Sequence, residues 1–134
     1  MGIEFATQGD LEQISLLDKH IQKEELARLI SVNRVLVAKD ENKLCGWLRY
    51  NLFWDNTPFM NLIYVLDKYQ GKGIGKQLVA KWEQTMKKHG HNRVLTSTLS
   101  NEEAQHFYRK LGYIDCGSLL LPNEPLEILF IKEI

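Results

Sequence analysis

The sequence predicts an α/β fold in which helices flank both faces of a mixed, mostly antiparallel central sheet. Strand-like segments joined by short turns fill residues 34–66, which predicts an antiparallel meander. A glycine-rich turn then leads into an amphipathic helix over 74–88, and another strand follows at 93–98. Two strands joined through a crossover helix run parallel, so the predicted sheet contains both strand directions. A length of 134 residues suits a single domain that spans residues 1–134.

The N-terminal part predicts a short strand followed by two helices. Residues 3–6 alternate apolar and polar side chains, as strands do. Leucines and isoleucines at helical spacing predict a helix over 8–20 and a shorter one over 24–30. Thr7 or Asp10 would cap the first of these helices, because both side chains can accept a hydrogen bond from a free helix N–H group.

The middle of the chain supplies the meander. Segments rich in β-branched, apolar and aromatic residues predict strands over 34–39, 43–54 and 59–66. Turn-forming residues at 40–42 and 55–58 separate these strands. The short turns require each strand to run antiparallel to the one before it.

The C-terminal part predicts one more helix and two strands. Ser100 and Glu103 are spaced as a capping box, which predicts a helix start, and Gly112 would end that helix. Apolar runs at 119–121 and 126–131 predict two final strands, and the prolines between them predict a hinge.

The turn between the third strand of the meander and the helix has the chemistry of an anion site. Its sequence is Gln70-Gly71-Lys72-Gly73-Ile74-Gly75-Lys76. N–H groups at a helix start lack partners, the helix dipole adds positive charge, and glycines let a ligand approach the backbone. Lys72 and Lys76 lie where the dipole disfavours cations, a conflict that a bound polyphosphate would remove. The alternative is a solvated, lysine-rich turn whose glycines serve its geometry only.

Two common phosphate-binding motifs do not fit this turn. A P-loop, G-x-x-x-x-G-K-[ST], would need glycine at Gln70 and serine or threonine at Gln77. A dinucleotide fingerprint, G-x-G-x-x-G, would need its third glycine at Lys76 or Leu78. The pattern that does fit is Q-x-x-G-x-G, which begins at Gln70.

This loop resembles the acetyl-CoA pyrophosphate loop of the GCN5-related N-acetyltransferases, the GNAT family. A second motif of that family reads N-x-x-A-x-x-F-Y-x-x-x-G-F/Y, and residues 101–113 match it at every fixed position. The matching residues are Asn101, Ala104, Phe107, Tyr108, Gly112 and Tyr113. Both motifs occur in the family's order and at its spacing, so the resemblance covers the chain from about Ile3 to its end. It implies a GNAT-type sheet and an acetyl-CoA-dependent N-acetyltransferase.

The resemblance also implies how acetyl-CoA is held, in a cleft where the strands over 59–66 and 93–98 splay apart. Backbone N–H groups of the glycine loop would hold the pyrophosphate, and the strand before the loop would pair with the pantetheine arm. A backbone N–H group near Val65 would polarise the acetyl carbonyl, and Asn101 would form a hydrogen bond with the pantetheine arm. The implied cofactor-binding residues are Ile63, Tyr64, Val65, Gln70, Gly71, Lys72, Gly73, Ile74, Gly75, Lys76, Asn101 and Tyr108.

By the same resemblance, Tyr108 is the catalytic general acid. A phenol with a pKa of about 10 stays protonated at neutral pH, so it can donate a proton to a thiolate whose thiol has a pKa of about 8.5. Without the surrounding motif, a core aromatic on the helix face would be the simpler interpretation of Tyr108.

The general base is where the sequence departs from the family. Many members place a glutamate on the strands that correspond to residues 59–62 and 96–98, and no carboxylate occurs there. A lysine-like amine with a pKa of about 10.4 needs about 4.6 kcal/mol to lose its proton at pH 7. Either a water chain removes this proton, or a loop residue does; the candidates are His20, Asp55 and Glu124. The amine acceptor, on a small molecule or a protein, is not identified by the sequence.

The sequence supports other classes of function less well. The absent carboxylate suggests an acyl-CoA-binding sensor or partner module without efficient turnover, and Tyr108 counts against it. Seventeen basic and seventeen acidic residues balance, which argues against nucleic-acid binding driven by charge and weakens an RNA- or nucleotide-binding role for the loop. No apolar run predicts a membrane segment, and no metal-ligand set occurs. Two cysteines are too few for a disulfide framework, so they are expected to be buried thiols in a reducing cytoplasm. An exposed edge on the final strand would permit a homodimer.

Overall fold

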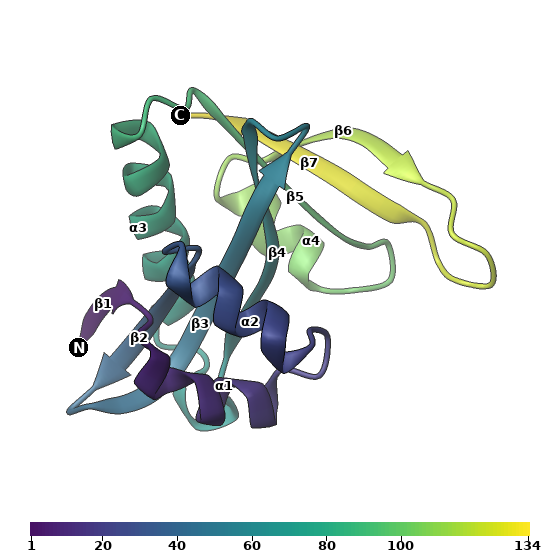
Figure 1. Ribbon diagram of the computed structural model, residues 1–134. Coiled ribbons are helices and arrows are strands. Elements are labelled where there is room, and N and C mark those ends of the chain that lie inside the picture. The colour runs from purple at the N-terminus through teal and green to yellow at the C-terminus, as the bar shows by residue number, and fades with distance from the viewer. The chain divides into compact units, whose positions relative to one another are not determined.

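The computed structural model describes residues 1–134 and contains a seven-stranded sheet and four α-helices (Figure 1). The strand order is β1-β2-β3-β4-β5-β7-β6; β4 and β5 pair in parallel, and the pairs β1–β2, β2–β3, β5–β7 and β6–β7 are antiparallel. The elements are β1 (Gly2–Phe5), α1 (Leu11–Leu17), α2 (Lys23–Ser31), β2 (Val35–Asp40), β3 (Lys43–Phe53), β4 (Thr57–Val65), α3 (Ile74–Lys88), β5 (Arg93–Leu99), α4 (Ala104–Lys110), β6 (Ile114–Leu119) and β7 (Glu127–Glu133).

The chain forms two compact units. The first unit comprises residues 1–51 and 62–82, and the second comprises residues 52–61 and 83–134. The first unit therefore holds β1, α1, α2, β2, most of β3, the end of β4 and the first part of α3. The second unit holds the start of β4, the last part of α3 and every later element.

In the first unit, helices cover both faces of β2 and β3. Val37 pairs with Trp47 on one face, and their side chains join a core with buried residues of α1 and α2. That core contains Ala6, Ile14, Leu26, Leu29, Ile30, Val35, Val37, Leu44 and Trp47. Tyr50 lies on the opposite face, and the centroid of its ring is 5.9 Å from that of Trp82 of α3. Side chains alternate along a strand, so the two contacts show that the helices pack on opposite sides.

A buried ion pair joins the end of α1 to β3 in the first unit. The carboxylate of Asp18 is fully buried and accepts hydrogen bonds from Arg49 Nε at 2.8 Å and Arg49 Nη2 at 3.3 Å. The indole of Trp47 donates to the same carboxylate at 3.2 Å, and the backbone N–H of His20 donates at 3.1 Å. Four hydrogen bonds thus satisfy a charge that would otherwise be costly to bury.

In the second unit, aromatic side chains of α4 and its following turn pack on β7. The ring of Phe130 is 5.8 Å from that of Tyr108, which is in turn 5.9 Å from that of Tyr113. The hydroxyl of Tyr113 donates to Glu83 of α3 at 2.8 Å, and Lys132 of β7 donates to the same carboxylate at 3.0 Å. This carboxylate therefore joins three parts of the unit.

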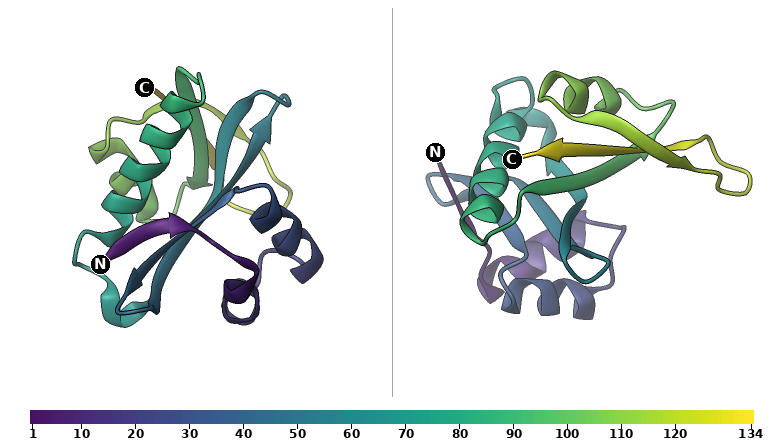
Figure 2. Two further views of the ribbon diagram at one scale, coloured as in Figure 1. Left: turned by 60° about the vertical axis from the view of Figure 1, so that its left-hand side comes forward. Right: turned by 90° about the horizontal axis from the view of Figure 1, so that it is seen from above.

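Strand β6 is the outermost strand of the sheet, and all six of its residues are exposed. Figure 2 shows β6 and β7 running side by side, joined by a long loop. The register of this pair is irregular between Asp115 and Gly117. The leucines at 119–121, predicted to form a strand, lie at the end of β6 and in that loop, and Leu120 is 88% exposed. The strand prediction was therefore misplaced, because pairing with β7 selects the weakly apolar residues 114–119.

The predicted capping box at Ser100 and Glu103 is also wrong. Helix α4 begins at Ala104, and no side chain caps it. Instead, the carboxylate of Glu102 accepts a hydrogen bond from the backbone N–H of Leu99 at 3.2 Å. This bond closes the turn before α4. The residues that a capping box would use therefore lie in this turn and not at the start of the helix. The predicted end of the helix is confirmed, because Gly112 donates to Arg109 in the turn that ends α4.

Candidate functional site

The glycine turn forms as predicted between β4 and α3, in the first unit. Asp67–Tyr69 make a single 3-10 turn after β4, and α3 then begins at Ile74. The first intrahelical hydrogen bond runs from the N–H of Gln77 to the carbonyl oxygen of Gly73, at 3.1 Å. The N–H groups of Ile74, Gly75 and Lys76 precede this bond and have no partner within the helix. Free N–H groups at the start of a helix attract anions.

Gly73 has a φ of +82°, a conformation that side chains with a Cβ rarely adopt. A Cβ built there would meet no atom within 4 Å, so the protein itself leaves the space beside this residue open. The open space and the free N–H groups together make a surface on which a phosphate could lie against the backbone.

Gln70 fixes the shape of this turn. Its side-chain amide donates to the carbonyl oxygen of Val65 at 2.9 Å and to the carboxylate of Asp67 at 3.3 Å. The side chain therefore ties the loop to the end of β4. The sequence predicted Gln70 as a cofactor-binding residue, and these bonds indicate how it would serve binding indirectly.

Lysines supply the positive charge of the loop. The ammonium groups of Lys68 and Lys72 lie over the ring of Tyr69, at 5.1 Å and 5.8 Å from its centroid. The side chain of Lys76, in the first turn of α3, is exposed. All of these cations are accessible to an anionic ligand.

The strand segment Ile63–Val65 lies directly before the loop and is partly exposed. Tyr64 is 42% exposed, and the centroid of its ring is 5.3 Å from that of Trp47. The backbone of this segment rests on β3: the N–H of Leu66 donates to Cys45 at 2.8 Å, and a Cβ on Gly46 would lie 2.6 Å from the carbonyl oxygen of Tyr64.

Gly46 is a residue near this site that the sequence motifs did not single out. A glycine inside a strand often marks a close approach of another backbone, and that signal was present in the sequence. Here it lets β4 lie close against β3 where the candidate pantetheine-binding segment begins.

Replacing Gly46 with alanine is expected to lower the free energy of unfolding by about 1–3 kcal/mol, because the added methyl group would overlap the carbonyl oxygen of Tyr64. Chemical denaturation measures this loss. Gly2→Ala is the matched control, since a Cβ at Gly2 would meet nothing within 4 Å. Equal unfolding midpoints for the two variants would contradict the assigned contact.

Asn101 and Tyr108 belong to the second unit. Asn101 is exposed in the turn that precedes α4. Tyr108 is only 5% exposed and packs against the rings of Phe107, Tyr113 and Phe130. Burial raises the pKa of Tyr108 above its ordinary value, and hydrogen bonding with Thr96 partly opposes this effect. The phenol therefore carries its proton at neutral pH, as a general acid must.

The candidates for the general base are all exposed loop residues. His20 follows α1, Asp55 lies in the turn between β3 and β4, and Glu124 lies in the loop between β6 and β7. The backbone N–H of His20 bonds to Asp18, and its ring is exposed. Nothing in their surroundings favours one of the three as the general base.

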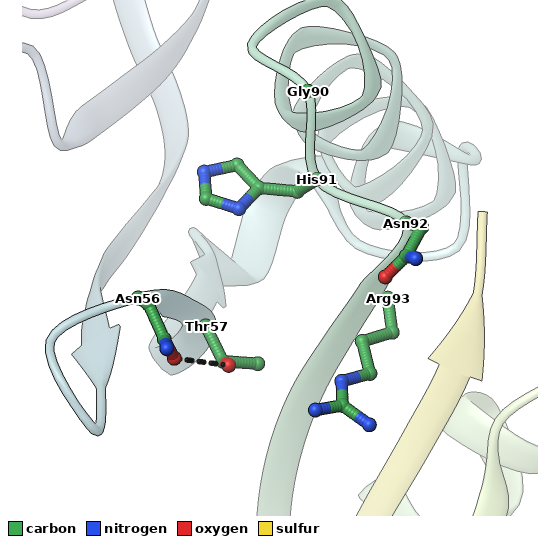
Figure 3. Close-up of a pocket in the computed structure, with 6 residues that line it drawn as sticks. All are labelled: Asn56, Thr57, Gly90, His91, Asn92 and Arg93. Carbon is green, nitrogen blue, oxygen red and sulfur yellow. Dashed lines mark hydrogen bonds between the residues drawn. The ribbon is translucent and has the colours of Figure 1, made fainter.

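A polar pocket of about 250 Å³ lies in the second unit, between the β3–β4 turn and the segment that follows α3 (Figure 3). Its lining residues are Asn56, Thr57, Gly90, His91, Asn92 and Arg93. The hydroxyl of Thr57 donates to Asn56 at 2.8 Å, and the side chains of His91 and Arg93 extend in different directions. The polar groups therefore do not converge on one ligand position. None of the predicted site residues lines this pocket.

Two further observations concern the surroundings of the protein. Both cysteines are free thiols; Cys45 is buried as predicted, whereas Cys116 on β6 is exposed, contrary to that prediction. None of the helices combines the length and the apolar character that crossing a membrane requires.

Comparison with known proteins gives one family. The family model described as the acetyltransferase (GNAT) family matches residues 7–113. No curated protein matches the chain in sequence.

Solved structures share the fold. A GNAT family acetyltransferase from Bacillus cereus ATCC 10987 has 24% identity and a TM-score of 0.80, with 98% of this chain and 96% of that chain covered. The ribosomal-protein-alanine N-acetyltransferase from Brucella melitensis has 18% identity and a TM-score of 0.82, with 100% of both chains covered. The PaiA N-acetyltransferase from Thermoplasma acidophilum, in complex with coenzyme A, has 20% identity, a TM-score of 0.79 and 100% coverage of both chains. These similarities confirm the predicted fold class.

Proposed function

Since the chain belongs to the acetyltransferase (GNAT) family, we propose that it transfers the acetyl group of acetyl-CoA to a primary amine of a small molecule or a protein. The observation that carries this proposal is the start of α3. Free N–H groups, an open glycine backbone and exposed lysines meet there, which is the chemistry that a pyrophosphate requires. A structural neighbour with coenzyme A bound supports the same cofactor.

In this proposal, each group of motif residues has its own part in the reaction. N–H groups of Gly71–Lys76 hold the pyrophosphate, with Gln70 fixing the loop. The backbone of Ile63–Val65 pairs with the pantetheine arm, as an added strand pairs with a sheet edge. Asn101 also binds the arm. The proposal extends to a single domain that spans residues 1–134.

The amine attacks the thioester carbonyl directly, the bond between carbon and sulfur breaks, and the thiolate leaves with the proton of Tyr108. The proton of the amine passes to water or to one of the exposed loop candidates. An α-amino group, with a pKa near 8, would lose its proton more readily than a lysine side chain. The absence of a carboxylate on the strands therefore favours acceptors of lower pKa.

The test is an assay of CoA release over a panel of α-amines, polyamines and lysine-like amines, with acetyl-CoA saturating and the pH varied. One class of amine is expected to raise CoA release well above background hydrolysis. The pH at half-maximal rate then shows whether a group of the protein or the solvent takes the proton of the amine. Tight acetyl-CoA binding with no turnover of any amine or of a protein-acceptor pool would favour the acyl-CoA-binding module instead.

Replacing Gly73 with valine is expected to weaken acetyl-CoA binding about 100-fold or more, because the side chain displaces the phosphate from the backbone and each lost charge-assisted hydrogen bond contributes about 1.5–3 kcal/mol. Calorimetry measures the dissociation constant. Gly90→Val is the matched control: Gly90 also has a positive φ, +93°, and open space, but it lies at the other end of α3. If both variants bound acetyl-CoA as the unmodified protein does, the loop assignment would be wrong.

We also propose a cytoplasmic location, where free thiols such as Cys45 and Cys116 stay reduced. The final strand, β7, pairs with β5 and with β6, so the exposed edge lies on β6 and not on the final strand as predicted. The open edge of β6 supports a homodimer in which two copies of this strand pair over the few residues beside its irregular register. Light scattering at several protein concentrations tests this arrangement.

A further inference from the structure

The side chain of Gln70 holds the backbone of Val65, the last residue of β4. Its amide nitrogen donates to the carbonyl oxygen of Val65 at 2.9 Å and to the carboxylate of Asp67 at 3.3 Å. An amide nitrogen carries two protons, so both of them have an acceptor here. One side chain of the glycine turn therefore reaches back to the strand segment that precedes the turn.

The peptide unit between Val65 and Leu66 is held from two sides. Its N–H, that of Leu66, donates to the carbonyl oxygen of Cys45 on β3 at 2.8 Å. Its carbonyl oxygen, that of Val65, accepts the hydrogen bond from Gln70. A peptide unit is planar, so two hydrogen bonds on opposite ends fix how it is turned about the strand axis. Without the Gln70 amide, only the bond to Cys45 would remain.

The N–H of Val65 points away from β3. The carbonyl oxygen of Tyr64 lies against β3, because a Cβ on Gly46 would be 2.6 Å from it. The peptide unit between Tyr64 and Val65 is trans, as every peptide in the chain is, so its N–H points opposite to its carbonyl group. The N–H and the carbonyl oxygen of one strand residue face the same edge, which agrees with Gln70 reaching the Val65 carbonyl on that side.

This edge of β4 is open at Val65. The parallel register with β5 pairs Phe59 with Leu95 and Met60 with Thr96, and Val65 lies well beyond these pairs. Val65 is also partly exposed. A ligand can therefore reach its N–H, which is the donor that the proposed function assigns to the thioester carbonyl. A donor of this kind is effective only when it is held in place before the reaction.

We propose that Gln70 is a positioning residue for carbonyl polarisation, which fixes the N–H of Val65 toward the acetyl carbonyl through its bond to the Val65 carbonyl oxygen. The proposal rests on the proposed function, since Gln70 acts through Val65 on bound acetyl-CoA. In the step concerned, the amine nitrogen bonds to the carbonyl carbon, and an electron pair moves onto the carbonyl oxygen, where the N–H of Val65 stabilises it. The pair returns as the bond between carbon and sulfur breaks, and the N–H keeps its proton throughout.

The direct test is infrared spectroscopy of acetyl-CoA labelled with ¹³C at its acetyl carbonyl, bound to the protein without any amine. A hydrogen bond weakens the carbonyl bond, so binding to the unmodified protein is expected to lower the stretching frequency. Gln70→Met keeps the approximate length of the side chain and removes its donor. This variant is expected to lower the frequency less. Equal frequencies in the two proteins would overturn the proposal, because a side chain that only shapes the loop would leave the carbonyl band where it is.

Binding and kinetics separate the two roles that Gln70 could have. Gln70→Met is expected to lower kcat about 5- to 50-fold, less than the 10²–10³ that outright loss of an oxyanion donor costs. CoA has no acetyl carbonyl, so the affinity for acetyl-CoA is expected to fall about 2- to 10-fold more than the affinity for CoA, the range for one hydrogen bond. Calorimetry measures both dissociation constants. Equal falls for the two ligands with an unchanged kcat would mean that Gln70 serves the pyrophosphate loop alone, and would overturn the proposal.

Gln77→Met is the matched control. Gln77 is an exposed glutamine in the first turn of α3, and its side chain forms no hydrogen bond. This variant is expected to keep the carbonyl frequency, kcat and both affinities of the unmodified protein. Equal changes in Gln70→Met and Gln77→Met would overturn the proposal, since any lost amide near the loop would then suffice. Gln70→Ala is a second variant without the donor, expected to act in the same direction, and circular dichroism checks that each variant folds.

The unmodified protein separates this proposal from the proposed function. If it bound no acetyl-CoA, the proposed function would fail, and the role of Gln70 with it. If it bound acetyl-CoA with the carbonyl frequency of the free cofactor, only the role of Gln70 would be overturned. A lowered frequency that Gln70→Met loses, with no turnover of any amine, would support the role of Gln70 and favour the acyl-CoA-binding module over the enzyme.

Discussion

Replacing Tyr108 with phenylalanine is expected to lower kcat by about 100-fold or more, within the range of 10²–10⁴ that general acid–base catalysis contributes. The variant loses only the hydroxyl. The ring keeps its contacts with Phe107, Tyr113 and Phe130, so the fold of the second unit is expected to persist. The affinity for acetyl-CoA is expected to change little. Steady-state kinetics of CoA release and calorimetry measure the two quantities separately.

Tyr113→Phe is the matched control for this prediction. Tyr113 is also buried, also packs in the aromatic cluster, and donates its hydroxyl to Glu83. Removing that hydroxyl leaves the carboxylate with Lys132 as its remaining partner, so a loss of stability rather than of kcat is expected. A similar fall of kcat in both variants would mean that the cluster, and not the Tyr108 proton, matters for turnover.

Replacing Asp18 with alanine is expected to lower the free energy of unfolding by about 3–5 kcal/mol, because the variant leaves the buried guanidinium of Arg49 without its counter-charge. The indole N–H of Trp47 and the backbone N–H of His20 lose their acceptor as well. Urea denaturation followed by tryptophan fluorescence measures the loss, since Trp47 lies beside the change.

The exposed pair of Glu25 and Arg28 provides the control. Its atoms are 2.7 Å apart, as close as those of the buried pair, but both side chains face water. Glu25→Ala is expected to leave the unfolding midpoint unchanged, because exposed pairs contribute little. If Asp18→Ala were as harmless as Glu25→Ala, the buried pair would not hold α1 on β3.

The Asp18 pair also predicts how stability depends on pH. Burial alone would raise the pKa of Asp18, but the hydrogen bonds and charge of Arg49, with the donors of His20 and Trp47, outweigh it and leave the pKa below its ordinary value. The folded state therefore binds fewer protons than the unfolded chain in acid. The contribution is complete above roughly pH 4, the ordinary range of an aspartate, and is lost as the pH falls through the folded pKa. The stability difference between the unmodified protein and Asp18→Ala should shrink below that pH.

Local patterns predicted the part of the fold that depends on neighbours in sequence. The helix over 74–88 has the predicted bounds, because its apolar stripe, its glycine start and its stop at Gly90 are all local signals. The glycine loop was recognised for the same reason, and its family is confirmed. Strand β6 was misplaced because its position depends on pairing with β7 and not on its own composition.

The sequence could not reveal contacts that only the folded chain creates. Asp18 and Arg49 are 31 residues apart, and no spacing rule joins them. Likewise, Thr96 looks like an ordinary strand residue until the register places it opposite Phe130 and beside Met60. The backbone chemistry of the candidate site was therefore predictable, whereas these side-chain contacts were not.

Strand β6 has hydrogen-bonding partners on one side only, and its register breaks between Asp115 and Gly117. A strand from another molecule could align with only a few residues on either side of that break, so long edge-to-edge stacks are disfavoured. The leucines at 119–121 are the apolar surface that such contacts would cover. Substitutions along this edge are therefore expected to change solubility. A charged side chain in place of Leu120 would keep concentrated protein in solution. A change that made the β6–β7 register regular would promote fibrous aggregates.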